Sequence, residues 1–122
     1  MSNRPFRVKD YLLHMLEAAD RILQYTAGVT KEQFLATPMM QDATVRNIEI
    51  IGEAANNLLQ ADSGFAERHP AIPFAQIYGM RNRIAHGYFA VSAVMVWETV
   101  AADIPALRTE ILRVLNELSR DA

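Results

Sequence analysis

The residues best suited to chemistry lie in one short segment, residues 81–88, with the sequence Arg-Asn-Arg-Ile-Ala-His-Gly-Tyr. A guanidinium such as that of Arg81 can clamp two phosphate oxygens and stabilise a pentacoordinate transition state. An imidazole such as that of His86 titrates near pH 6.5, at about the pH where a general acid or base is useful. Arg81 and His86 are therefore the candidate catalytic residues, and their chemistry would be performed on a phosphate group.

Two neighbours are candidate supporting residues. Asn82 could orient the imidazole or the phosphate, and Arg83 adds positive charge. Between residues 64 and 97 the charged side chains are Glu67, Arg68, Arg81 and Arg83, so this window is basic within a chain of formal net charge −2. It is the part of the sequence that would favour an anionic ligand. If the phosphate belonged to RNA, the ribose 2′-hydroxyl would supply the nucleophile and no metal would be needed.

Helical geometry restricts how the pair could meet. Five positions separate Arg81 from His86, which places them about 140° apart around a regular helix. Gly87 could end the helix and let Tyr88 fold back, or two copies of the chain could face each other and share a site. A purely structural alternative stays open, in which Arg81 pairs with Glu49 or Glu53 and His86 only caps a helix end.

Composition excludes several other classes of site. The 122 residues suit one domain over residues 1–122, and 51% hydrophobic residues suit a buried core. The absence of cysteine excludes disulfides and thiolate chemistry. No histidine pair has the spacing of metal ligands and no glycine-rich phosphate loop occurs, so we expect neither a metal nor a cofactor. Without a signal peptide or an apolar span, a cytoplasmic protein is expected.

Hydrophobic periodicity predicts an all-α fold, an antiparallel bundle of about four main helices. The predicted helices span about residues 7–27, 40–59, 73–85 and 92–120, with a short helix opening at Thr30 in a capping box. Pro105 should kink or split the last helix near Asp103. The apolar surface of helix 40–59 is wide, and the small residues Gly52 and Ala55 on it would allow another helix to approach closely.

Arg81-x4-His86-x-Tyr88 resembles the Arg-x4-His-x-Tyr motif of the HEPN superfamily. More closely, the chain is similar to its HepT-like group, also called DUF86. The likeness extends through an ordered series of segments, at residues 8–12, 46–54, 77–82, 84–88, 96–97 and 104–107.

This resemblance implies a helical homodimer in which Arg81 and His86 of both chains line a shared cleft. Family members of this kind act as toxins and as metal-independent ribonucleases. They are commonly paired with a nucleotidyltransferase antitoxin of the MNT type, which is reported to transfer AMP onto the motif tyrosine, here Tyr88. Added phosphate charge beside a basic cleft could block RNA entry.

Two other interpretations compete with the ribonuclease toxin. The chain could be a non-catalytic dimeric subunit that binds nucleotide or a nucleotidyltransferase partner and uses Tyr88 only as a modification site. It could also be a purely structural helical dimer, in which changes at Arg81, His86 or Tyr88 would have no effect on growth.

Overall fold

The computed structural model describes residues 4–86 and 92–121, and every regular element within these ranges is a helix. This confirms the predicted all-α class. The elements in chain order are α1 (Arg4–Tyr25), α2 (Lys31–Leu35), α3 (Pro38–Ala61), α4 (Phe65–Arg68), α5 (Phe74–His86), α6 (Ala93–Glu98), the π-helix η2 (Thr99–Asp103) and α7 (Ile104–Asp121).

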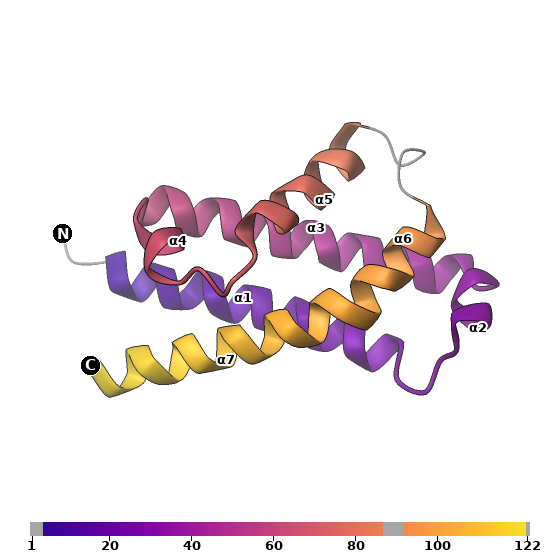
Figure 1. Cartoon of the computed structure of the whole chain (residues 1–122), viewed down its shortest axis with the longest axis horizontal. Helices are drawn as coiled ribbons and strands as arrows, with labels where there is room; N and C mark the ends of the chain where they lie inside the picture. The colour runs from indigo at the N-terminus through magenta and orange to yellow at the C-terminus, as the bar shows by residue number, and fades with distance from the viewer. Residues whose placement is uncertain (1–3, 87–91, 122) are drawn as a thin grey trace.

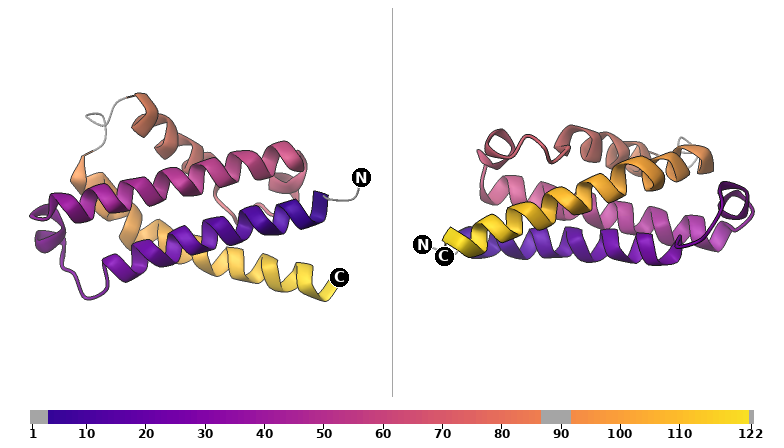
Figure 2. Two further views of the ribbon diagram at one scale, coloured as in Figure 1. Left: turned by 180° about the vertical axis from the view of Figure 1, so that it is seen from behind. Right: turned by 60° about the horizontal axis from the view of Figure 1, so that its bottom comes forward.

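The long elements form an antiparallel bundle, as the periodicity predicts. Helices α1, α3 and α5 alternate in direction, and α6, η2 and α7 return as one bent rod, so that the two ends of the chain lie at the same end of the bundle (Figure 1). Helix α1 packs against both α3 and α7, and α5 packs on α3. Figure 2 shows from two further sides that α5 rises away from α3 toward its own C-terminal end. Residues 81–86 therefore lie on the part of α5 that diverges from α3.

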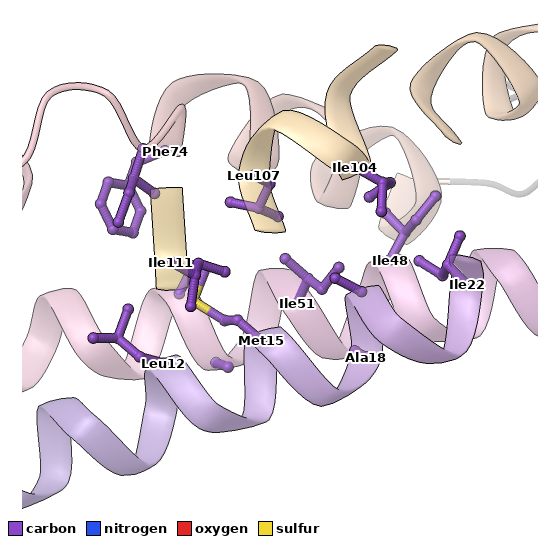
Figure 3. Close-up of a cluster of buried hydrophobic side chains, with 14 of the residues drawn as sticks. Leu12, Met15, Ala18, Ile22, Ile48, Ile51, Phe74, Ile104, Leu107 and Ile111 are labelled. Carbon is purple, nitrogen blue, oxygen red and sulfur yellow. The ribbon is translucent and has the colours of Figure 1, made fainter. Parts of the chain in front are cut away.

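Apolar side chains from α1, α3, α5 and α7 fill the centre of the bundle (Figure 3). Leu12, Met15 and Ile22 of α1 are fully buried, as is Ile111 of α7. Burial of one such side chain contributes about 1.5–3 kcal/mol, so this core holds the helices that carry the site. None of the helices within the described ranges combines the length and the hydrophobicity that a membrane span requires.

Several helix ends follow from local sequence chemistry. The backbone N–H of Gln33 donates to Thr30 Oγ1 at 3.1 Å, and the N–H of Thr30 donates to Gln33 Oε1 at 2.9 Å, which confirms the predicted capping box. Gly28 has a φ of +71°, a conformation that glycine adopts without strain, and it follows the end of α1. Ser92 accepts a hydrogen bond from the N–H of Met95 at 3.1 Å and caps α6.

Pro105 explains the bend in the last helix. A proline cannot donate a backbone hydrogen bond, and its ring clashes with the carbonyl four residues earlier, here that of Ala101. The chain accommodates this with the wider turns of a π-helix over Thr99–Asp103, after which α7 begins at Ile104. The predicted split near Asp103 is therefore confirmed, and its form is a local widening of the helix.

Candidate functional site

Residues 81–86 of the candidate segment form the last turns of α5, whose described range is Phe74–His86. Phe74 and Ile84 of α5 are buried, and Ile77 and Met80 are packed against the core. These apolar residues hold α5 on α3 and so fix which way the polar residues between them face. The predicted role of Gly87 in ending this helix concerns a residue outside the described ranges and remains a prediction.

The side chain of Arg81 lies directly over Gly52 of α3. A Cβ atom placed on Gly52 would lie 2.7 Å from Cδ, 3.0 Å from Cβ and 3.1 Å from Cγ of Arg81. Nonpolar carbon atoms normally approach no closer than about 3.5 Å, so the stem of the arginine occupies the space that any larger residue would need. The close approach expected at Gly52 is confirmed, and the group that approaches is the stem of the candidate catalytic arginine.

Packing, rather than an ion pair, places this arginine. Arg81 is half-buried. Within the part of the chain that the structure describes, no ion pair links Arg81 to Glu49 or Glu53, which was the structural alternative. An arginine stem can pack on an apolar surface while its guanidinium projects beyond it. Arg81 is therefore anchored through its methylene groups, and no carboxylate of the described residues neutralises its charge through an ion pair.

A second contact joins α5 to α3 one turn before Arg81. The hydroxyl of Tyr78 donates to Oδ1 of Asn56 at 2.6 Å, in a partly buried position. Four positions separate Gly52 from Asn56 on α3, and three separate Tyr78 from Arg81 on α5. Such spacings place residues on the same side of a helix. Sequence reasoning did not assign a role to Tyr78 or Asn56, because a hydrogen bond between residues 22 positions apart depends on how the two helices align.

Arg83 lies on a different side of α5. It lines a groove between α5 and the rod formed by α6 and η2, together with residues that include Met95, Glu98, Thr99 and Asp103. Two positions along a helix correspond to about 200°, which explains the separation from Arg81. The same groove is therefore bordered by one basic residue, Arg83, and two acidic residues, Glu98 and Asp103. The basic window of the sequence is thus divided between two faces, and Arg81 does not share its face with Arg83.

Of the remaining candidate residues, the structure describes Asn82 and the backbone of His86. Asn82 is exposed on α5, and His86 is the last residue of the same unbroken helix. By helical register, residue 86 lies close to residue 82 and about 140° from residue 81, so α5 alone does not present Arg81 and His86 on one face. The side chain of His86 and the whole of Gly87 and Tyr88 lie outside the described residues, and the roles assigned to His86 and Tyr88 remain predictions.

Among the described residues, no three histidine, aspartate or glutamate side chains come together in a way that could hold a metal ion. The described part of the site is accordingly one of guanidinium, amide and phenol groups.

Comparison with known proteins places the chain in a family. The family model described as Ribonuclease HepT-like matches residues 15–114. The chain belongs to the HepT-like family. The matched range includes the candidate segment, the helix α5 that carries Arg81, and the neighbouring elements α3, α6 and η2.

Several relatives are similar to this HepT-like chain over most of its length. A Methanocaldococcus jannaschii protein named "Gamma-glutamylcyclotransferase and putative RNase" is 40% identical over 93% of the chain, which spans half of that protein. A Caldanaerobacter subterraneus subsp. tengcongensis protein named "Putative RNase" is 35% identical over 89% of the chain and 95% of its own length. A Thermococcus cleftensis protein named "Probable ribonuclease HepT" is 39% identical over 82% of the chain and 88% of its own length. No solved structure matches the chain significantly.

Proposed function

We propose that this HepT-like protein is a metal-independent endoribonuclease and the toxin of a toxin–antitoxin pair, with Arg81 and His86 as its catalytic residues. Three relatives with ribonuclease names support an RNA substrate. The observation that carries the assignment to Arg81 is its packing over Gly52, which orders a side chain that carries no ion pair to a described residue. An arginine held in this way is ready to receive a phosphate.

The proposed reaction is an internal transfer at phosphorus. A general base removes the proton of the ribose 2′-hydroxyl, whose oxygen attacks the adjacent phosphorus. The bond to the 5′-oxygen of the next nucleotide breaks, and a general acid returns a proton to that oxygen. The products are a 2′,3′-cyclic phosphate and a 5′-hydroxyl. His86 would move protons, Arg81 would stabilise the negative charge on the pentacoordinate phosphorus, and Asn82 and Arg83 would orient and attract the RNA.

A homodimer would bring the catalytic groups together. Because Arg81 and His86 lie about 140° apart on one helix, a single α5 presents them in different directions. A second copy facing the first could supply the imidazole beside the first copy's guanidinium. The same symmetry would create two equivalent sites. We therefore propose that Arg81 and His86 meet in a cleft between two subunits, in a cytoplasmic protein with access to RNA.

The proposed control of this activity is modification of Tyr88. A nucleotidyltransferase antitoxin of the MNT type would transfer AMP to the hydroxyl of Tyr88, two residues after His86. The added phosphate carries negative charge and would compete with RNA for Arg81. Mass spectrometry of the protein expressed with and without its neighbouring nucleotidyltransferase tests this. Addition of AMP that is lost in Tyr88→Phe supports the proposal, and an unmodified Tyr88 contradicts it.

The catalytic proposal is tested by cleavage of labelled RNA in a nuclease-free preparation. His86→Ala should lower the rate by about 10²–10⁴-fold while the protein remains folded, because a general acid or base typically contributes this much. His14→Ala is the matched control, since His14 is an exposed histidine on α1. Wild-type cleavage should persist in EDTA. Equal rates for wild type and His86→Ala would contradict the role of His86, and modification of Tyr88 without any cleavage would favour the non-catalytic partner subunit.

A further inference from the structure

We propose that Gly52 is the positioning residue for Arg81, and that its lack of a side chain sets the direction in which the guanidinium projects. This inference rests on the proposed function only for its effect on RNA cleavage. Its physical content, that Gly52 determines where the Arg81 side chain lies, is independent of what the protein does.

Three consecutive carbon atoms of Arg81, Cβ, Cγ and Cδ, occupy the space into which a side chain on residue 52 would extend. The hypothetical Cβ of residue 52 would be 2.7 Å from Cδ and 3.1 Å from Cγ, well inside van der Waals contact. Gly52 itself is buried beneath this stem. Because Gly52 has no side chain, it leaves space on the surface of α3, and the methylene groups of Arg81 lie in that space.

Neighbouring contacts make the side chain, rather than the helix, the part that would move. Residues Phe74 and Ile84 bury α5 against the core on either side of Arg81, and the hydrogen bond from Tyr78 to Asn56 lies one turn away. The Cβ of Arg81 would be 3.0 Å from a new Cβ, which requires only a small adjustment of the backbone. The contact at Cδ is shorter, and rotation about the side-chain bonds can relieve it. Gly52→Ala would thus redirect the guanidinium.

A redirected guanidinium would matter for catalysis. Charge stabilisation at phosphorus requires the donors to lie where the negative charge develops, and a displacement of about 1 Å can lower a rate by about 10²-fold. Gly52 would act only through Arg81 and would not itself contact RNA.

The chain provides a matched control in Gly79. It is also a glycine within a helix, two residues before Arg81, but a Cβ built on Gly79 would have no neighbour within 4 Å. Gly79→Ala and Gly52→Ala both exchange a glycine within a helix for an alanine, which has the higher helix propensity. They differ in whether the new methyl group meets Arg81.

The experiment follows the side-chain Nε–H resonance of Arg81 by NMR, assigned by its loss in Arg81→Lys. In Gly52→Ala this resonance should shift, and RNA cleavage should fall by about 10- to 100-fold, mainly in kcat. In Gly79→Ala both should match the wild type. An unmoved Arg81 resonance in folded Gly52→Ala, or the same shift in Gly79→Ala, would overturn the inference. If the wild type does not cleave RNA, the proposed function fails while the resonance still tests Gly52.

A double variant covers the case in which Gly52→Ala folds poorly. Arg81→Ala removes the Cγ and Cδ atoms that the new methyl group would meet, so the Gly52→Ala/Arg81→Ala protein should unfold at a higher temperature than Gly52→Ala alone. Compared with the Arg81→Ala protein as well, the destabilisation by Gly52→Ala should be smaller when Arg81 is already alanine, and such non-additivity is the signature of two residues in direct contact. A double variant that is less stable than Gly52→Ala would contradict the proposed contact.

Discussion

The hydroxyl of Tyr78 donates a hydrogen bond to Oδ1 of Asn56 at 2.6 Å and links α5 to α3 one turn before Arg81. The two residues are 22 positions apart, so the bond joins segments that only the folded structure brings together. Together with the packing of Arg81 on Gly52, this hydrogen bond fixes the position of α5 relative to α3.

Removal of this bond should weaken the fold modestly. Tyr78→Phe keeps the ring and deletes the hydroxyl, which leaves a partly buried amide oxygen without this donor. A hydrogen bond of this kind contributes about 0.5–1.5 kcal/mol, and we expect a loss of that size in urea unfolding. Tyr25→Phe is the control, because Tyr25 at the end of α1 is 40% exposed. Equal stability of wild type and Tyr78→Phe would show that the bond contributes nothing.

The fold could be predicted from the sequence because its signals are local. Polar side chains at Thr30 and Ser92 precede helices, Gly28 follows one, and Pro105 interrupts another. Each acts on its own few residues: the structure confirms the capping box predicted at Thr30 and the break predicted at Pro105, Ser92 caps α6, and Gly28 follows α1 with a positive φ. The apolar stripes then specify which faces are buried, as Leu12 and Met15 illustrate.

The candidate site could be predicted only in part. The motif identified Arg81, and the small size of Gly52 predicted a close approach, but the sequence did not say that one contacts the other. That contact depends on the relative rotation and spacing of α3 and α5, as does the bond between Tyr78 and Asn56. The spacing of two positions between Arg81 and Arg83 already predicts that they lie on different faces of one helix. The sequence does not indicate that Glu98 and Asp103 line the same groove as Arg83, because these two residues come from α6 and η2.

His69 should make the stability of the protein depend on pH. Burial lowers the pKa of His69 below its usual value of 6.5, and Arg68 and Arg113 add to this while Glu117 opposes it. Its ring lies against Phe65, with 4.4 Å between ring centroids. The unfolded chain therefore binds a proton more readily than the folded chain. The contribution of neutral His69 is complete above the unfolded pKa and is lost as the pH falls from 6.5 through the folded pKa.

A comparison of wild type with His69→Gln isolates this contribution. The difference in free energy of unfolding between the two proteins should be constant at about pH 8 and should shift against the wild type toward about pH 5. His14→Gln, at an exposed position on α1, is the control for general effects of losing a histidine. A difference that does not change with pH would show that His69 titrates alike in the folded and unfolded chains.

In the proposed mechanism Arg81 and His86 act on the same phosphate, although their positions on one α5 are about 140° apart. Mixing two inactive variants, Arg81→Ala and His86→Ala, tests it most directly. In a dimer whose sites each take Arg81 from one subunit and His86 from the other, a mixed dimer regains one intact site. After refolding the two together, random pairing predicts recovery of about a quarter of the wild-type RNA cleavage rate. A mixture that remains as inactive as either variant alone would contradict the shared cleft.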